Sequence, residues 1–223
     1  MIGARLSNPG LVVMNQRIVL ATGNAGKAKE FAEMLGGQFD IVLQTTLQLV
    51  AAEETGSSFL ENALLKARFA AQQSGLPAIA DDSGLEVAAL DGAPGVYSAR
   101  YAGEQASDAD NNAKLLAALA RIPPEQRAAR FRCVVVYVRS ANDAEPLIAE
   151  GSWNGAIALA ERGTGGFGYD PLFSDVGEGA VITAERIAAA STSAELLPAE
   201  KHARSHRGAA VRDLCRQLQE QTP

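Results

Sequence analysis

The stretch LATGNAGKAKEF, Leu20 to Phe31, joins the end of an apolar run to a glycine-containing polar turn and the start of a helix. The hydrophobic pattern predicts a strand from Arg17 to Ala21 and a helix from Lys27 to Leu35. Strands that alternate with helices in this way are typical of α/β proteins. The stretch therefore indicates the fold class, and its polar turn is the first candidate for a binding site.

This turn does not match a phosphate-binding loop of the Walker type. A Walker loop requires a glycine where this chain has Ala21, and a hydroxyl group where Ala28 follows Lys27. What remains is a helix that starts near Gly26 with a lysine in its first turn. Free N–H groups at a helix start attract anions, and the lysine adds positive charge. We therefore expect the turn to bind an anionic ligand by another arrangement.

Strand-like and helix-like segments continue along the chain, although not in strict βαβ order. This mixture predicts an α/β fold around a mixed β-sheet. A capping-box spacing at Ser58 marks the start of one helix, and Ser107 caps another. The further predicted strands are 40–44, 78–80, 131–139 and 147–159, the last interrupted at Gly151 and Gly155 as a hairpin or bulged pair, and the further helices are 59–73, 108–121, 194–200 and one after Ser205.

Composition limits the class of protein. A chain of 223 residues with 47% hydrophobic content forms one large domain or two lobes that share a core. The formal charge of −6 argues against binding to the backbone of nucleic acids. Cys133 and Cys215 lie too far apart for a zinc motif, and no apolar run is long enough to span a membrane, so we expect a cytoplasmic protein without membrane contact. Residues 1–13 are predicted to be a loose extension.

The strongest chemical signal is IADDSG, Ile79 to Gly84, which places two adjacent acids at the end of a buried strand. Buried carboxylates are costly unless a cation pairs with them, and a divalent metal is a common partner. Because neighbouring residues of a strand point to opposite faces, only one of Asp81 and Asp82 needs to face a site. The alternative is that the pair caps a turn. Glu54, just before the second helix, is a candidate for a further carboxylate ligand.

Cations gather beside the glycine-containing loops and helix starts of this acidic chain. They are Lys27, Lys66, Arg100, and a closing group of Lys201, His206 and Arg207. This pattern favours a polyanionic ligand, although most lysines are simply solvated. In the closing SHRG, the N-terminal N–H groups, the imidazole and the guanidinium can converge on carbonyl or phosphate oxygens.

The loop GTGGFGYDPLF, Gly163 to Phe173, is the other distinctive stretch. Its four glycines allow a ligand to approach the backbone closely, and Phe167 or Tyr169 could stack on a base. Asp170 is held extended by the following proline, which suits a carboxylate directed at a ligand. The alternative is a tight turn packed by two aromatic side chains.

Together these motifs resemble the family of noncanonical purine nucleoside triphosphate pyrophosphatases, which cleave inosine and xanthosine triphosphates. The matches occur in the order found in the family, from about Arg17 to Leu218. They are TGNAGK (Thr22 to Lys27), EETGSSFLENALLKA (Glu53 to Ala67), ADDSGL (Ala80 to Leu85), GAPGVYSARYAG (Gly92 to Gly103), GTGGFGYDPLF (Gly163 to Phe173) and KHARSHRG (Lys201 to Gly208).

The resemblance implies an elongated α/β fold of two lobes around a long mixed β-sheet with flanking helices, and a nucleotide cleft between the lobes. Residues 14–223 would form this single two-lobed domain, and the protein would be a homodimer. The implied reaction converts a purine nucleoside triphosphate and water into the monophosphate and pyrophosphate, with Mg²⁺ as cofactor.

Matching the family's motifs onto this chain also implies roles for its residues. Asp82 would accept the proton of the attacking water, and Asp82 and Glu54 would bind Mg²⁺. The other implied substrate-binding residues are Thr22, Gly23, Asn24, Ala25, Gly26, Lys27, Lys66, Ser83, Arg100, Phe167, Gly168, Tyr169, Asp170, Lys201, His206 and Arg207.

Base selectivity has a simple physical reason in this scheme. A 6-keto purine presents an acceptor where adenine presents an amino donor, so a pocket of donors discriminates between them by roughly 10⁴ in the best cases. We assign this role to His206, Arg207 and loop N–H groups, with Phe167 stacking on the base. Two other functions stay open: a nucleotide-sensing protein without turnover, and a phosphotransferase. The carboxylates argue against the first, and the failed Walker pattern argues against the second.

Overall fold

A six-stranded mixed sheet organises the protein, in the order β2-β1-β3-β4-β5-β6. The computed structural model describes residues 16–37 and 39–220, so the predicted extension 1–13 lies outside the described residues. Strand β1 pairs in parallel with β2 and β3, and the remaining pairs are antiparallel, which confirms the predicted mixed sheet. The strands are β1 (Arg17–Leu20), β2 (Asp40–Leu43), β3 (Ala78–Val87), β4 (Ala128–Val138), β5 (Leu147–Ile157) and β6 (Phe173–Ser174).

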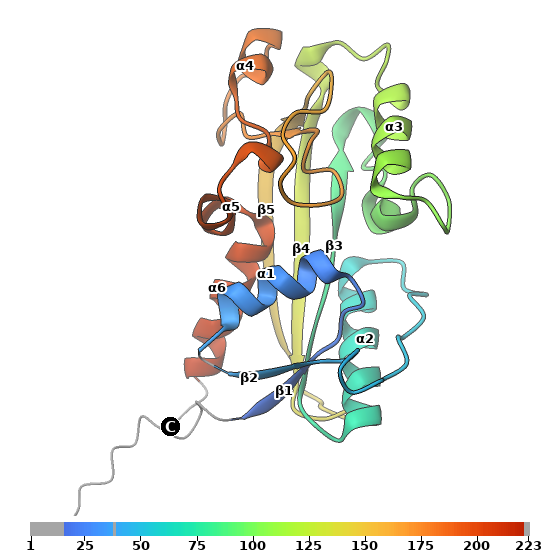
Figure 1. The fold of residues 1–223 in the computed structure, drawn as a ribbon, viewed down its shortest axis with the longest axis vertical. Coiled ribbons are helices and arrows are strands. Elements are labelled where there is room, and N and C mark those ends of the chain that lie inside the picture. The colour runs from blue at the N-terminus through green and yellow to red at the C-terminus, as the bar shows by residue number, and fades with distance from the viewer. Residues whose placement is uncertain (1–15, 38, 221–223) are drawn as a thin grey trace, which may run out of the picture.

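Helices flank this sheet along an elongated molecule. Figure 1 shows the long strands β3, β4 and β5 running along it, with α1 and α2 beside β1 and β2 at one end and α3 and α4 at the other. None of the helices within the described residues is long and apolar enough to cross a membrane. The α-helices are α1 (Ala25–Leu35), α2 (Phe59–Ser74), α3 (Asp108–Ala118), α4 (Ala184–Ala189), α5 (Pro198–Arg204) and α6 (His206–Glu220).

Alternate residues of β3 enter two different cores. Ile79 packs with Phe31 of α1 and Leu214 of α6 on one face of the sheet. Ala78 and Ala80 pack with the alanine-rich face of α2 on the other. The same alternation directs the next two residues, both acids, to opposite faces. The two core layers therefore determine the surroundings of each acid.

Strand β3 is longer than the sequence predicted. The predicted strand ended at Ala80, but the structure continues it to Val87, and Asp81 and Asp82 pair with β4 inside the sheet. A run of polar residues normally marks the end of a strand, because a buried carboxylate needs a partner. Here the partners come from helices distant in the sequence, so the prediction of this end was wrong.

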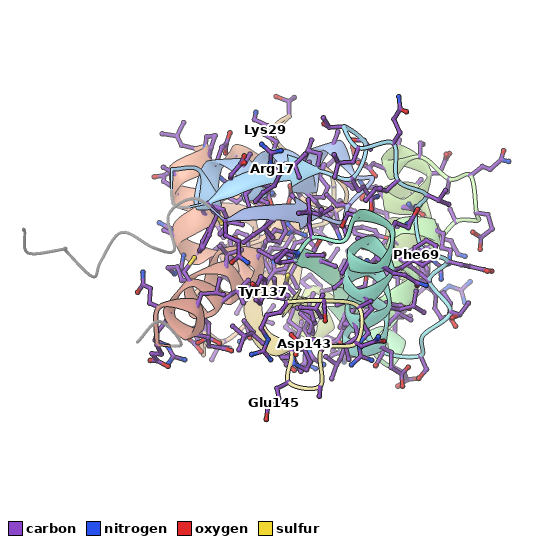
Figure 2. All side chains as sticks on the ribbon, turned by 90° about the horizontal axis from the view of Figure 1, so that it is seen from below. Arg17, Lys29, Phe69, Tyr137, Asp143 and Glu145 are labelled. Atoms are coloured by element: carbon purple, nitrogen blue, oxygen red, sulfur yellow. The ribbon has the colours of Figure 1, made fainter. Side chains whose placement is uncertain are left out.

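Strand β5 is continuous, so the predicted interruption at Gly151 and Gly155 was wrong. A Cβ atom at Gly151 would overlap the backbone of α6 at His206, and one at Gly155 would overlap Phe173. Both glycines thus allow neighbouring elements to approach β5 closely. Figure 2 looks onto the end of the molecule where Asp143 and Glu145 form the β4–β5 turn, on the side away from Arg17 and Lys29.

Some helix ends in the structure lie where the sequence predicted them, and others do not. Helix α2 follows the predicted range, and its N-cap Ser58 accepts a hydrogen bond from the N–H of Glu61. Helix α3 ends at Ala118 and not at Arg121. Segment 194–200 is not one helix: a 3₁₀ turn occupies 193–195, and α5 begins at Pro198, where a proline needs no N–H partner.

Candidate active site

One cleft of about 230 Å³ gathers residues from both ends of the molecule. Its walls come from the turn before α1, from α2 and β3, from the glycine-rich loop after β5, and from the start of α6. Most of the predicted site residues line it: Thr22, Gly23, Asn24, Lys27, Glu54, Lys66, Asp82, Ser83, Phe167, Gly168, Tyr169, Asp170, Lys201, His206 and Arg207.

Three predicted residues lie outside the lining of this cleft. Gly26 lies directly beneath Phe167, and a Cβ atom there would overlap the phenyl ring. Arg100 pairs with Glu54, at 3.6 Å, and its guanidinium lies over the ring of Tyr97. Ala25 lines a separate groove beside β2. Gly26 and Arg100 therefore contact the residues that form the cleft.

The polar turn before α1 is built by its own side chains. Asn24 is the N-cap residue, and its Oδ1 accepts a hydrogen bond from the N–H of Lys27 at 3.0 Å. Thr22 Oγ1 accepts one from the N–H of Asn24 at 3.2 Å. The turn therefore holds the Lys27 side chain at the edge of the cleft, where its Nζ lies 3.1 Å from Asp81.

Two carboxylates of the cleft converge on one ammonium group. Lys66 Nζ lies 2.7 Å from Glu54 Oε1 and 3.1 Å from Asp82 Oδ1. Asn62, which is fully buried, donates to the other oxygen of Asp82 at 3.2 Å. Asp82 thus does not cap a turn, and the alternative interpretation of the acid pair does not hold for it.

The surroundings shift the two carboxyl groups in opposite directions. Burial raises the pKa of Asp82, and the nearby carboxylates of Glu54 and Asp81 reinforce this against the attraction of Lys66 and Lys27. Burial also raises the pKa of Glu54, but Lys66, Lys27 and Arg100 together hold it below its ordinary value. Asp82 is therefore the more basic carboxylate of the pair, which suits a proton acceptor.

The carboxylates near Lys66 fit a magnesium ion that takes some of its ligands from the protein and the others from a bound phosphate compound. Glu54 and Asp82 direct hard oxygen atoms at a common position, which the ammonium of Lys66 approaches. Mg²⁺ is commonly bound by one or two carboxylates together with substrate phosphates. The residues that the structure describes contain no group of three or more His, Cys, Asp or Glu suited to an ion. The pair therefore fits a shared site and not a site built by the protein alone.

A buried chain of alternating charges runs from Lys201 in α5 to Lys27 at the start of α1. Lys201 Nζ contacts Glu30 at 2.7 Å, and Glu30 contacts Arg207 at 2.5 Å. The guanidinium of Arg207 reaches Asp81 at 3.2 Å, and Asp81 in turn contacts Lys27. Buried charges of this kind require partners on every side. The chain therefore links helices α1, α5 and α6 to β3.

Asp81 is a member of this chain and does not line the cleft. Burial alone would raise its pKa, but Lys27 and Arg207 hold the pKa of Asp81 well below its usual range. Its Oδ2 accepts every contact, and its buried Oδ1 has no partner among the described atoms. Of the two acids, Asp82 therefore lines the cleft and Asp81 does not, which agrees with the alternation of strand residues.

His206 and Phe167 line the part of the cleft formed by the start of α6 and the glycine-rich loop. The imidazole of His206 stacks on Phe131 with ring centroids 4.7 Å apart, and its buried Nδ1 has no partner in the described structure. Burial, together with the charges of Arg207 and Lys201, lowers the pKa of His206 well below its ordinary value, so the ring is neutral. Lys201 Nζ lies 5.0 Å from the centroid of the Phe167 ring.

Tyr169 and Asp170 of the glycine-rich loop form hydrogen bonds within the protein. Tyr169 is buried among core residues, and its hydroxyl donates to the carbonyl oxygen of Ser98 at 2.8 Å, so its ring packs in the core and does not offer a stacking face. The carboxylate of Asp170 accepts hydrogen bonds from Lys201, Ser193 and the N–H of Phe167. The expected extended carboxylate directed at a ligand is instead directed at these donors.

Sequence reasoning missed several residues that shape the cleft. Glu30 follows Lys27 by one helical turn, so its place on the same face of α1 was available as a signal. The pairing of Asn62 with Asp82, the stacking of Phe131 on His206 and the contact of Ser193 with Asp170 depend on the tertiary fold. No local pattern in the sequence indicates these contacts.

Comparisons with known proteins agree with this geometry. A dITP/XTP pyrophosphatase of Shigella flexneri is 56% identical over 198 residues, covering 88% of this chain and 95% of that protein. A dITP/XTP pyrophosphatase of Thioalkalivibrio sulfidiphilus is 55% identical over 204 residues, covering 91% of this chain and 98% of that protein. The solved structure of a HAM1 protein from Coxiella burnetii superposes with a TM-score of 0.79 at 46% identity, covering 92% of this chain and 99% of that one.

The sequence profile of the Ham1 family matches residues 18–217, which is nearly the whole of the described structure. This range begins in β1 and ends in α6, so it contains every strand and helix around the cleft except the first residue of β1 and the last turn of α6. The chain therefore belongs to the Ham1 family.

Proposed function

We propose that this protein hydrolyses noncanonical purine nucleoside triphosphates, namely ITP, dITP and XTP, to the nucleoside monophosphate and pyrophosphate, and so removes them from the nucleotide pool. The observation that carries this proposal is the pair Asp82 and Glu54, which converges on one position beside the anion-binding turn at Asn24. The high identity to dITP/XTP pyrophosphatases over most of the chain supports the same substrates.

The phosphate chain of the substrate would lie along the positively charged side of the cleft. Lys66 contacts both Glu54 and Asp82, Lys27 lines the cleft and is held by Asp81, and Arg100 adds charge beside Glu54. These cations would offset the negative charge that develops on the departing pyrophosphate. The turn residues Thr22, Gly23, Asn24, Ala25 and Gly26 would position the phosphate oxygens.

Asp82 would act as the proton acceptor. It takes a proton from a water molecule, whose oxygen forms a bond to the α-phosphorus while the bond from that phosphorus to the bridging oxygen of the β-phosphate breaks. Burial makes Asp82 more basic, and Asn62 and Lys66 fix the orientation of its carboxylate. Glu54 and Asp82 are the residues that would hold Mg²⁺, and the ion would supply positive charge to the phosphate oxygens.

The base would be recognised at the opposite end. Phe167 offers a ring face, and the neutral imidazole of His206 lines the same cleft. Arg207 supports this wall, although its own donors are engaged by Glu30, Asp81 and Ser83. An N–H donor from His206 or from the loop that binds a 6-keto oxygen would exclude adenine, because the amino group of adenine would leave that donor unpaired.

Three further properties belong to the same proposal. We expect residues 14–223 to act as one two-lobed domain, a homodimer to be the active form, and the cytoplasm to be its location. The resemblance of the motifs to the pyrophosphatase family supports the first two. Light scattering coupled to size-exclusion chromatography tests the dimer, with a monomer at assay concentration as the contradicting result.

Product analysis tests the proposed function. The protein and Mg²⁺ are incubated separately with inosine, xanthosine and adenosine triphosphates, and the products are separated by ion-exchange chromatography. The proposal predicts monophosphate and pyrophosphate from the first two and nearly intact adenosine triphosphate. Diphosphate and phosphate would instead favour a phosphotransferase, and tight binding without products would favour a nucleotide sensor.

A further inference from the structure

The backbone N–H and C=O groups of Gly168 both form hydrogen bonds with side chains of α3. The carboxylate of Asp108 accepts a hydrogen bond from the N–H of Gly168 at 2.7 Å. One helical turn later, Asn112 donates to the carbonyl oxygen of the same glycine at 3.2 Å. Residues four apart on a helix share a face, so both side chains extend to the glycine-rich loop together.

The other side of this loop is attached to a different part of the molecule. Ser193 and Lys201 bind the carboxylate of Asp170, and the N–H of Gly165 donates to the carbonyl oxygen of Ala194. Phe167 lies between this attachment and the one to α3. The position of its ring therefore depends on both attachments.

Gly168 itself gives the loop little stiffness at this point. Its φ angle is +60°, which a residue with a side chain rarely adopts, and a Cβ atom there would meet nothing within 4 Å. The two hydrogen bonds to α3 side chains orient the backbone of Gly168, together with the hydrogen bond from the N–H of Asp170 to the carbonyl oxygen of Phe167 that closes the turn. Asp108 also lines the cleft beside Gly168.

We propose that Asp108 is a positioning residue for base recognition: by binding the N–H of Gly168, it fixes the loop that carries Phe167 over the base end of the cleft. Asn112 adds a second hydrogen bond, to the carbonyl oxygen of the same glycine. This inference rests on the proposed function, because it assumes that a purine base binds beside Phe167. It assigns α3 to the binding of the nucleoside and not to the binding of the phosphates.

The chain offers a matched control for the effect of Asp108 on α3 itself. Asp110 forms the capping box with Ser107, through hydrogen bonds to its N–H and hydroxyl groups. Both acids lie in the first turn of the same helix and both are exposed. Asp110→Ala therefore weakens the helix start while leaving the contact with Gly168 in place.

The experiment compares wild type, Asp108→Ala, Asp108→Asn and Asp110→Ala in inosine triphosphate hydrolysis and in inhibition by inorganic tripolyphosphate. Loss of one charge-assisted hydrogen bond predicts a KM for inosine triphosphate about fivefold to tenfold higher in Asp108→Ala, with kcat changed much less. Inhibition by tripolyphosphate, which has no base, should stay within about twofold of wild type in every variant. Asp108→Asn retains an acceptor oxygen and should recover most of the affinity.

Three results would overturn the inference. The first is a wild-type KM in Asp108→Ala, and the second is an equal increase in Asp110→Ala, which would point to the helix alone. The third is an equal loss of tripolyphosphate inhibition, which would point to a general disturbance of the cleft. If the wild-type protein neither binds nor cleaves inosine triphosphate, the proposed function fails and the inference fails with it; wild-type cleavage with unaffected variants rejects the inference alone.

Discussion

Asp81 and Asp82 are neighbours on β3, yet Asp81 contacts Arg207 on one face of the sheet and Asp82 contacts Lys66 on the other. The alternation of strand residues alone produces this division. One acid becomes part of a buried ionic chain, and the other faces the cleft. The same chemical change at the two positions should therefore have different consequences.

Asp82→Asn should remove turnover and leave nucleotide binding. The amide cannot accept the proton of the attacking water, so kcat should fall by about 10² to 10⁴. Calorimetric titration with a non-hydrolysable inosine triphosphate analogue checks that binding persists, and steady-state kinetics measures the loss. A variant with more than half of the wild-type kcat would rule out Asp82 as the proton acceptor.

Asp81→Asn should mainly reduce stability. It leaves Arg207 and Lys27 without their shared carboxylate inside the protein, which predicts a loss of about 3–5 kcal/mol in the free energy of unfolding. Asp40→Asn is the control, because Asp40 pairs with Arg17 at the surface and should cost at most about 1 kcal/mol. Urea denaturation measures both, and equal losses would contradict the structural role of Asp81.

Glu54→Gln should weaken the binding of magnesium and leave the fold intact. Losing one of two charged oxygen ligands should raise the Mg²⁺ concentration for half-maximal activity by about tenfold or more. Glu53→Gln is the matched control, since Glu53 is the exposed acid next to it and does not line the cleft. Titration of activity with Mg²⁺ at saturating inosine triphosphate checks this, and identical curves for the two variants would exclude Glu54 as a ligand.

The neutral state of His206 predicts a pH dependence of stability. Its pKa in the folded protein lies well below the value of about 6.5 that an unfolded chain has, so below that pH the unfolded state binds a proton that the folded state does not. Stability should therefore fall as the pH drops below about 6.5, by up to about 1.4 kcal/mol per pH unit from this residue.

His206→Gln should remove that part of the slope, as measured by urea denaturation at pH 7, 6 and 5. His202→Gln is the matched control, because it removes the other of the chain's two histidines and keeps His206. An unchanged slope in His206→Gln would mean that the pKa of the imidazole is the same in the folded and unfolded states, which contradicts the prediction.

Local patterns were enough to predict much of the fold and the order of the motifs. The turn at Asn24 and the start of α2 at Ser58 follow from residues close together in the chain. Strand alternation predicts that Asp81 and Asp82 face opposite sides, and the choice of Asp82 as the acid in the cleft came from the family resemblance. Short-range hydrogen-bonding and alternation rules describe such features, because their partners lie within a few residues.

The remaining features depend on contacts between distant segments. Glu30 and Lys201 are 171 positions apart, and no local pattern links them. The length of β3 depends on cations from α1, α2 and α6, and the continuity of β5 depends on the close approach of α6 at Gly151. In each case, a residue that disfavours a strand locally is tolerated because a distant segment packs against it or pairs with it.

In the proposed reaction, water attacks the α-phosphorus of the nucleotide. The position of attack is measured by hydrolysing inosine triphosphate in water enriched with ¹⁸O and analysing both products by mass spectrometry. Attack at the α-phosphorus predicts one ¹⁸O atom in the inosine monophosphate and none in the pyrophosphate. The label in the pyrophosphate would place the attack at the β-phosphorus and contradict the role assigned to Asp82.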